Sequence, residues 1–312
     1  MVAFIEELRA ALGADRVGTE VPLAPLTSFG IGGPADYFFD AKTTEELVGA
    51  VTIARANRVP VTLLGGGSNV LVADRGIRGL VVRLRATGIG MVGEREVRAD
   101  AGMTLNGLVR WTIARGLGGL ETWAGTPGTL GGAIYGNAHF GGRLISERLV
   151  TVSLLEVDGS VTDVPPGDMA FGYDASRLQT TREIVLRAIV RVTPGCDPVV
   201  LRAAAREALA RRKATQPLHL RSAGCAFQNP DPGRDSVPDG LPWSAGALID
   251  RAGLKDATVG GACVSSVHAN FIVNKGGATA ADVRQLIELC RTEVLVRFGV
   301  LLRDEIVYLG EF

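Results

Sequence analysis

The hydrophobic and polar positions of this chain follow helical and strand patterns in turn along its whole length. A helical pattern covers residues 1–12, 44–57, 104–115, 198–212 and 281–298. Short apolar runs, many of them rich in β-branched residues, predict strands over 60–64, 70–72, 80–84, 150–157, 183–192 and 300–309. This mixture of elements predicts an α+β protein.

Two of the predicted helices have a clear apolar face. In the last helix, the residues spaced for burial are Val283, Leu286, Ile287, Cys290, Val294 and Phe298. In the helix over 198–212, the apolar face consists of Val199, Val200, Ala203, Ala204 and Leu209. Three cations, Arg211, Arg212 and Lys213, follow at its carboxyl end, where the helix dipole favours positive charge.

Two glycine-rich loops lie about 60 residues apart. The first, Gly65-Gly66-Gly67-Ser68-Asn69, follows the predicted strand at 60–64, and the second runs from Gly125 to Gly132. Successive glycines reach positive φ and let backbone N–H groups converge into an anion-binding nest. A short helix from Leu130 would offer free N–H groups at its amino end. Together the loops predict a site for a long, doubly phosphorylated cofactor, and ordinary tight turns are the alternative.

The familiar nucleotide signatures are absent from both loops. A P-loop needs a lysine before its serine or threonine, and Gly67 is followed directly by Ser68 and Asn69. A dinucleotide fingerprint needs a long helix after its glycines, whereas the residues at 70–72 read as a strand. An ATPase and a Rossmann dehydrogenase are therefore disfavoured.

Composition narrows the class of protein further. The 312 residues include 33 basic and 33 acidic side chains, a balance that gives no sign of a nucleic-acid or membrane partner. The hydrophobic fraction of 46% is that of a globular protein, and the length suggests two or three domains. The amino terminus reads as a helix rather than a signal peptide, and no apolar run reaches membrane-spanning length.

The four cysteines, Cys196, Cys225, Cys263 and Cys290, are far apart and lack any C-x-x-C spacing. This pattern supports neither a zinc site nor a disulfide framework. We therefore expect no metal, and a reduced protein in the cytoplasm.

Five segments together carry a resemblance to a known family. They read TSFGIGGPAD at 27–36, GGGSN at 65–69, AGTPGTLGGA at 124–133, QNP at 228–230 and VSSVHANFIVN at 264–274. In order and spacing they resemble the UDP-N-acetylenolpyruvoylglucosamine reductase (MurB) family over nearly the whole chain. The length is similar to that of the shorter class, which lacks a long insertion in the third domain.

The resemblance implies a fold and a division into domains. It implies a two-part FAD-binding module of the PCMH or vanillyl-alcohol-oxidase type, together with an α/β substrate domain. On this basis, residues 1–85 form the first flavin subdomain and 86–196 the second, with 299–312 returning to the active site. Residues 197–298 form the substrate domain.

The resemblance also implies a reaction. NADPH reduces non-covalently bound FAD, and the flavin then passes hydride to the enolpyruvyl group of a UDP-sugar, giving the peptidoglycan precursor UDP-N-acetylmuramate. Since an enol ether resists hydride addition unless its carboxylate absorbs charge, the site needs a cationic clamp and a general acid. We expect a monomer, with no nucleic-acid or membrane partner.

Two residues match the family's catalytic segments. Cys225 stands where the family usually has serine as proton donor, and a thiol with a reference pKa near 8.5 is a reasonable acid. A buried structural cysteine is the alternative. Glu305 matches a catalytic glutamate near the carboxyl terminus, with a solvated strand-edge residue as its alternative. Strand alternation makes the neighbouring Asp304 the better candidate for that solvated position.

One segment departs from the family at a charged position. The family commonly has arginine directly after Tyr173, and this chain has Asp174 there. A carboxylate cannot replace a cationic clamp. Arg177 lies about one turn further on if the segment is helical, so we hypothesise that it supplies the guanidinium. Gln228 likewise stands where lysine is usual.

The remaining site residues are implied by the matching motifs. Cofactor contacts are predicted for Gly65, Gly66, Gly67, Ser68, Asn69, Gly125, Thr126, Pro127, Gly128, Gly131, Gly132 and Asn137. Substrate contacts are predicted for Lys213, Asn229, Lys255 and Asn270. His139 and His219 show no partner for a catalytic pair, and His268 is expected to hydrogen-bond within the fold, so no histidine receives a catalytic role.

Two other functions stay open at the level of sequence. An alcohol oxidase on the same scaffold often tethers its flavin through histidine or cysteine in the glycine region, and neither loop contains one. A flavoprotein paralogue with an altered catalytic set is the stronger alternative, since Asp174, Cys225 and Gln228 all depart from the family in one site.

Overall fold

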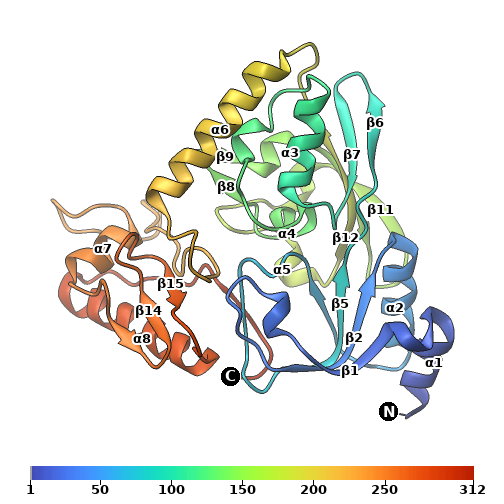
Figure 1. The fold of residues 1–312 in the computed structure, drawn as a ribbon, viewed down its shortest axis with the longest axis horizontal. Coiled ribbons are helices and arrows are strands. Elements are labelled where there is room, and N and C mark those ends of the chain that lie inside the picture. The colour runs from blue at the N-terminus through green and yellow to red at the C-terminus, as the bar shows by residue number, and fades with distance from the viewer. Residues whose placement is uncertain (1) are drawn as a thin grey trace. The chain divides into compact units, whose positions relative to one another are not determined.

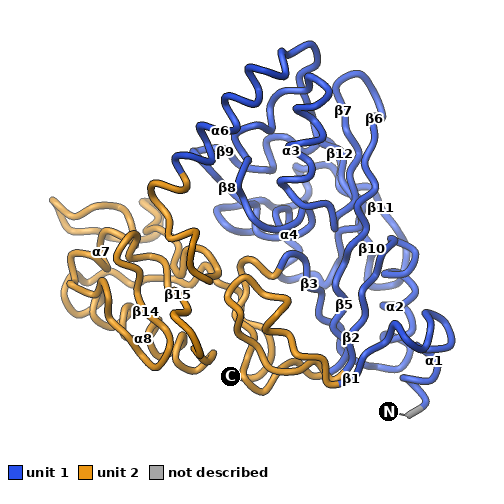
Figure 2. The backbone as a smooth tube through the Cα atoms, viewed as in Figure 1, with its two compact units in different colours: residues 1–19, 37–66, 79–211 blue, residues 20–36, 67–78, 212–312 orange. Residues whose placement is uncertain are grey.

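The computed structural model describes residues 2–312, which form two compact units. Unit 1 comprises the described residues up to 19 together with 37–66 and 79–211. Unit 2 comprises residues 20–36, 67–78 and 212–312 (Figure 2). The chain thus passes between the units several times, so unit 2 includes two stretches of the predicted first flavin subdomain. The three-domain division of the sequence stays a prediction.

Two sheets form the framework around the core of unit 1 (Figure 1). The first has the order β1 (Val17–Pro22), β2 (Pro34–Ala41), β5 (Ile77–Leu84) and β3 (Val61–Leu64). The second is antiparallel, with the order β11 (Val161–Val164), β10 (Leu149–Leu155), β12 (Ile184–Arg191), β7 (Glu96–Asp100) and β6 (Ile89–Gly93). Because β3 and β5 run parallel, the glycines after Leu64 lie at the carboxyl end of a parallel strand, where α/β folds collect ligands.

Helices pack on these sheets around one apolar core. They are α1 (Val2–Leu12), α2 (Thr44–Ala56), α3 (Leu105–Ala114), α4 (Leu130–Tyr135), α5 (Leu178–Thr181) and α6 (Pro198–Thr215), whose last four residues belong to unit 2. Short 3-10 turns cover Ala14–Arg16, Ala24–Leu26, Glu121–Trp123, Ile145–Arg148 and Pro166–Met169. The helix α4, which follows the second glycine loop, packs against β12 and β7. Its buried Leu130 and Ile134 anchor that loop to the sheet.

Unit 2 has a second, separate core. Its strands are β4 (Val70–Val72), β13 (Thr258–Val259), β14 (Ala262–Val264), β15 (Ile272–Asn274) and β16 (Val307–Leu309), and its helices are α7 (Ala245–Arg251) and α8 (Ala280–Phe298). The strand β16 pairs in parallel with β4, directly after the first glycine loop. At the start of α8, Thr279 and Asp282 form a capping box. The Asp74 carboxylate accepts from the N–H groups of Ala280 and Ala281 at 2.8 and 3.0 Å.

Most predicted elements are confirmed within one or two residues, and two expectations are corrected. Residues 300–306 are irregular, so only 307–309 of the predicted last strand exist. In α6, Val199 and Val200 are about two-thirds exposed, and Leu201 is the buried residue instead.

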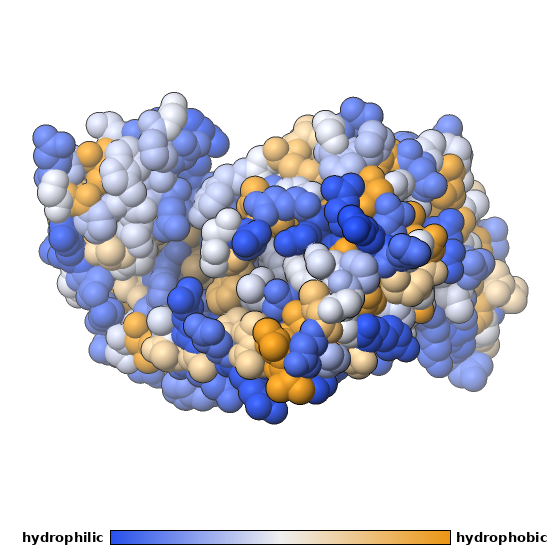
Figure 3. All heavy atoms as spheres, turned by 90° about the horizontal axis from the view of Figure 1, so that it is seen from above, coloured by the Kyte–Doolittle hydropathy of each residue, from blue (hydrophilic) through white to orange (hydrophobic). Residues whose placement is uncertain are grey.

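In the view of Figure 3, hydrophobic side chains stand in small groups among hydrophilic ones. Within residues 2–312, no helix is long and apolar enough to cross a bilayer.

Candidate functional site

Gly65 and Gly66 of the first glycine loop lie against the second loop within unit 1. A Cβ atom added to Gly66 would lie 2.7 Å from the Cα of Gly128, and one added to Gly65 would lie 2.7 Å from the Thr129 hydroxyl oxygen. Neither position has room for a side chain. Two unrelated tight turns have no need to meet in this way, so the contact favours a shared ligand site over the tight-turn alternative.

The first loop has the features of an anion nest. Among the described residues, the N–H groups of Gly66, Gly67 and Ser68 find no acceptor. Gly67 has a φ of 60°, and a Cβ atom there would lie 2.3 Å from the Leu26 carbonyl oxygen. Ser28 holds the Gly67 carbonyl through its N–H at 2.9 Å. Successive free N–H groups, two of them on glycines, fit a diphosphate, the central group of FAD.

The second loop is held from inside the fold. Gly125 donates its N–H to the Asn106 side chain at 2.7 Å, and the Thr126 carbonyl accepts from the same amide at 3.3 Å. Pro127 is exposed, whereas Thr126 is buried. The loop therefore offers a rigid surface free of long side chains, as a flat ring system requires.

One expectation about this loop is wrong. The N–H groups at the start of α4 are not free, because Leu130 and Gly131 donate to the carbonyls of Met103 and Ala101 at 2.8 Å each. Gly132 donates to the Thr129 hydroxyl at 3.3 Å. The amino end of α4 thus satisfies its own donors, and the free donors lie in the first loop.

In unit 2, the Cys225 segment runs beside the carboxyl-terminal segment. Glu305 donates its N–H to the Ala226 carbonyl at 2.9 Å, and Gln228 donates to the Arg303 carbonyl at 2.9 Å. These bonds bring Glu305 next to Ala226, one residue from Cys225. The two predicted catalytic residues, 80 positions apart in the sequence, therefore lie on neighbouring segments.

Asn69 and Asn270 hold these two segments. The Asn69 amide donates to the Glu305 carbonyl at 3.0 Å, and the Asn69 carbonyl accepts from Val307 at 3.0 Å. The buried Asn270 accepts from the Phe227 N–H at 2.9 Å and donates to the Phe227 carbonyl at 2.7 Å. Both amides thus position the Cys225 and Glu305 segments, and their predicted contacts with cofactor and substrate stay predictions.

Arg212 is a candidate site residue that sequence reasoning missed. Its side chain is buried, and the thiolate form of Cys225 is the charged group that acts on it. Burial lowers the pKa of Arg212, and Cys225 opposes that shift. The sequence shows three adjacent cations at the end of α6, and helical periodicity alone did not show which one turns inward.

The expectation for Asp304 is also wrong. Its carboxylate forms an ion pair with Arg291 of α8 and accepts from the Tyr308 hydroxyl at 3.2 Å. Burial raises the pKa of Tyr308, and the Asp304 charge adds to that effect. Asp304 therefore ties the carboxyl-terminal segment to α8 rather than facing solvent.

The predicted substrate residues other than Asn270 are more loosely placed. Lys213 is exposed near the end of α6. Asn229 is exposed and accepts from the Ala245 N–H at 3.0 Å, at the start of α7. Lys255 pairs with Asp250 at 2.7 Å. Their contacts with substrate stay predictions.

The other cysteines and His268 behave mostly as structural residues. Cys263 and Cys290 are buried, and burial raises the pKa of the Cys290 thiol to about 12. Cys196 and Cys225 are partly exposed. His268 accepts from the Asn270 N–H at 3.3 Å, as expected for hydrogen bonding within the fold. No group of three or more potential metal ligands occurs within residues 2–312.

Two predicted site residues, Asn137 and Arg177, lie beyond α4 in unit 1. Asn137 is buried, donates to the Gly172 carbonyl at 2.8 Å and accepts from Ser146 at 3.3 Å, so its amide serves the fold. Arg177 donates to Glu183 at 2.9 Å and to the Asp168 carbonyl at 3.1 Å. Residues 172–175 form a turn rather than a helix, so the condition for the Arg177 hypothesis is not met.

His139 has a partner after all. Its Nδ1 atom lies 3.0 Å from the Asp174 carboxylate, so the statement that it lacks one is wrong. The signal in the sequence was the carboxylate at Asp174, where the family has arginine. The Asp174 side chain is mostly buried in the structure, and a buried carboxylate usually has a partner. Sequence alone did not show which residue that partner is.

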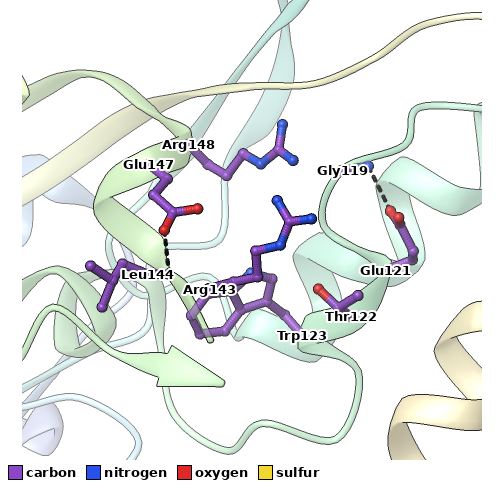
Figure 4. A pocket seen from close by; sticks show the side chains of 8 residues that line it. All are labelled: Gly119, Glu121, Thr122, Trp123, Arg143, Leu144, Glu147 and Arg148. Atoms are coloured by element: carbon purple, nitrogen blue, oxygen red, sulfur yellow. Dashed lines mark hydrogen bonds between the residues drawn. The ribbon is translucent and has the colours of Figure 1, made fainter. Parts of the chain in front are cut away.

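Two hollows in unit 1 lie away from the first glycine loop. One, of about 40 Å³, is lined by Arg143, Arg148 and Trp123 among others (Figure 4). There Glu121 and Glu147 accept backbone N–H groups at 2.6 and 3.2 Å. The other, a groove of about 570 Å³, runs between α3 and α6 and reaches Gly125. The first is too small for a cofactor.

Two family models match different parts of the chain. A family model described as the C-terminal domain of UDP-N-acetylenolpyruvoylglucosamine reductase matches residues 216–309. A model described as an FAD binding domain matches residues 35–165. The α+β fold expected from the sequence, with a flavin module and a separate substrate domain, is confirmed by these matches.

Individual proteins match nearly the whole chain. The UDP-N-acetylenolpyruvoylglucosamine reductase of Synechococcus sp. (strain JA-3-3Ab) is 40% identical over 95% of this chain and 92% of its own length. UDP-N-acetylenolpyruvoylglucosamine reductase 2 of Symbiobacterium thermophilum is 39% identical over 99% and 98%. The crystal structure of the Thermus caldophilus enzyme superposes with a TM-score of 0.76 and 34% identity, covering 93% of this chain and 98% of that one.

Proposed function

This chain belongs to the UDP-N-acetylenolpyruvoylglucosamine reductase (MurB) family, and we propose that it reduces the enolpyruvyl group of UDP-N-acetylglucosamine enolpyruvate to give UDP-N-acetylmuramate. It is an FAD-dependent oxidoreductase of peptidoglycan precursor synthesis. We propose NADPH as the hydride donor and a monomer in the cytoplasm as the working form. The observation that carries the catalytic assignment is the adjacency of the Cys225 and Glu305 segments.

Gly65 to Asn69 and Gly125 to Gly132 would hold the flavin. When bound, FAD supplies the hydride that adds to the substrate double bond. The free N–H groups of Gly66, Gly67 and Ser68 would accept its diphosphate. Gly66 keeps the surface that faces Gly128 free of side chains, because an added Cβ atom would lie 2.7 Å from the Gly128 Cα.

Cys225 would supply the proton that completes the reduction. Hydride addition places negative charge on the substrate carboxylate and the adjacent carbon, and that carbon must then be protonated. Glu305 would orient the reacting group beside the thiol. The buried Arg212 next to Cys225 would add positive charge close to this negative charge. It would thereby stabilise the anionic intermediate that forms after hydride addition.

The remaining polar residues would hold the UDP-sugar. Lys213 and Asn229 would bind the enolpyruvyl or diphosphate end, with weaker contributions from Lys255 and Asn270. Arg177 stays a candidate cation, although a substrate carboxylate would compete there with Glu183. Replacing Arg177 with alanine slows reoxidation of the flavin if this candidate is correct.

The first experiment follows flavin absorbance anaerobically, with NADPH added before the enolpyruvyl substrate. We expect bleaching and then recovery in the wild-type protein. Cys225→Ala should slow recovery by about 100-fold or more, the usual contribution of a general acid. Cys225→Ser, which installs the family's usual donor, is the matched control and should retain most of the rate.

Bleaching without recovery in the wild-type protein would instead favour the altered paralogue. The departures at Asp174, Cys225 and Gln228 are the observation behind that second function. Flavin that stays attached to denatured protein would revive the oxidase alternative.

A further inference from the structure

His139 and Asp174 form a close pair that the mechanism above does not use. The imidazole Nδ1 lies 3.0 Å from Asp174 Oδ1, and the ring lies beside Tyr173 with centroids 5.0 Å apart. The Asp174 side chain is only 11% exposed, and its Oδ2 atom has no hydrogen-bond partner within residues 2–312. A carboxylate at this distance holds the imidazole in one orientation.

The pair is anchored at the far end of α4. Asn137 donates to the Gly172 carbonyl at 2.8 Å, and Ser176 donates to the Tyr135 carbonyl at 2.7 Å. These bonds fix the turn that carries Asp174 to the residues just after α4. Because α4 has six residues, it is about 9 Å long, so the pair lies about one short helix from the second glycine loop.

The geometry leaves one nitrogen of His139 available. Nδ1 faces Asp174, whereas Nε2 has no partner among the described residues, and the side chain is 32% exposed. A carboxylate on one ring nitrogen fixes the orientation of the imidazole. When the imidazole is protonated, both ring nitrogens carry hydrogen, so the exposed one can donate to an anion.

We propose that protonated His139 binds the carboxylate of the enolpyruvyl substrate and that Asp174 positions it. This inference rests on the proposed function. It gives a role to the position where the chain departs from the family's arginine. The Asp174 side chain cannot be a cation, but its carboxylate positions the imidazole of His139, which can be one. His139 binds substrate directly, and Asp174 is a positioning residue.

The neighbouring charges are compatible with this role. Arg143 pairs with Phe140 across β8 (His139–Phe140) and β9 (Arg143–Leu144), so alternation directs its side chain to the face opposite His139. Gln179, which is uncharged, donates to the Asp174 carbonyl at 2.9 Å. Arg177 is already engaged by Glu183 and the Asp168 carbonyl.

Calorimetric titration of the oxidised, FAD-loaded protein with UDP-N-acetylglucosamine enolpyruvate tests the proposal at pH 6 and pH 8. His139→Gln should weaken binding about tenfold or more at pH 6 and remove the difference between the two pH values. Asp174→Asn should weaken binding at both pH values, because the imidazole loses the carboxylate that orients it. His219→Gln, at an exposed position, is the matched control and should bind as the wild type does.

A second probe separates this inference from the proposed function. UDP-N-acetylglucosamine lacks the carboxylate, so His139→Gln should bind it as well as the wild type does. Unchanged binding of the enolpyruvyl ligand by His139→Gln at both pH values would overturn the inference and leave the proposed function standing. Absence of enolpyruvyl binding in the wild type would overturn both. Equal loss for the two UDP-sugars would mean a structural role, which also overturns the inference.

Discussion

At the scale of single residues, Gly66 shows how space, rather than backbone conformation, selects glycine. The φ angle of Gly66 is not positive, so its backbone does not require glycine. A Cβ atom there would nevertheless lie 2.7 Å from the Gly128 Cα. Gly67 combines both constraints. A nest built from such residues tolerates almost no substitution.

Gly66→Ala should therefore separate the two loops and weaken flavin binding. Forcing one extra methyl into a packed contact typically costs about 1–3 kcal/mol, so we expect at least a several-fold loss of bound FAD after gel filtration. Gly90→Ala is the control, since nothing lies within 4 Å of its added Cβ. Full flavin occupancy in Gly66→Ala would contradict the role assigned to the loop contact.

A second residue-scale prediction concerns pH. The hydrogen bond from Arg16 lowers the pKa of Glu46 to about 2. An unfolded glutamate has a pKa of about 4.3, so this pair stabilises the fold above that pH and loses its effect as the pH falls through about 2. Glu46→Gln should cost about 1 kcal/mol or less at pH 7, because the pair is partly exposed.

Thermal unfolding between pH 7 and pH 3 measures this effect. The difference in melting temperature between wild type and Glu46→Gln should shrink as the pH falls below about 4. Glu94→Gln is the control, because Glu94 is exposed and has no ion pair within residues 2–312. A difference that does not change with pH would contradict the assignment.

At the scale of elements, threonine caps determine where α2 and α4 begin. The Thr129 hydroxyl accepts from Gly132 at the start of α4, as the Thr43 hydroxyl accepts from Glu46 at the start of α2. Such threonines satisfy an N–H group that the helix leaves unpaired. Thr129 has an added role, because its hydroxyl fills the space that Gly65 leaves open.

Replacing each threonine with alanine distinguishes the two roles. Both variants should lose about 1 kcal/mol of stability in urea unfolding, the usual value of an N-cap. Only Thr129→Ala should also lower flavin affinity, because α2 lies outside the glycine loops. Equal flavin affinity in both variants would show that the α4 cap serves the fold alone.

At the scale of the whole molecule, the chain builds two separate apolar cores. One consists of residues in unit 1, including Leu108 and Trp123, and the other of residues in unit 2, including Phe227 and Leu286. The carboxyl-terminal segment belongs to the second core through Ile306. The stability of unit 2 therefore bears directly on where Glu305 lies.

Leu286→Ala should destabilise unit 2 by about 2–5 kcal/mol, because this fully buried side chain would leave a cavity. Leu295→Ala on the same helix is the matched control, since its side chain is 44% exposed. Denaturant unfolding followed by circular dichroism measures both. Similar losses for the two variants would contradict the assignment of the α8 core face.

The sequence alone determined what depends on neighbours along the chain. Helical spacing located α8 and its buried residues Val283 and Leu286, and β-branched runs located β3 before the glycines, because these patterns follow from local geometry. The motif order indicated the flavin module and the reductase family. Local pattern also misled, since it extended the last strand over residues that are irregular.

Only the tertiary structure decided which distant residues meet. The contact of Gly66 with Gly128, the turn of Arg212 toward Cys225 and the pairing of His139 with Asp174 all join segments separated in sequence. Hydrophobic periodicity indicates on which face of its own helix or strand a residue lies. Which distant residue it contacts depends instead on how whole helices and strands pack together. Burial and charge pairing are properties of that packing, so they could not be read from the order of residues.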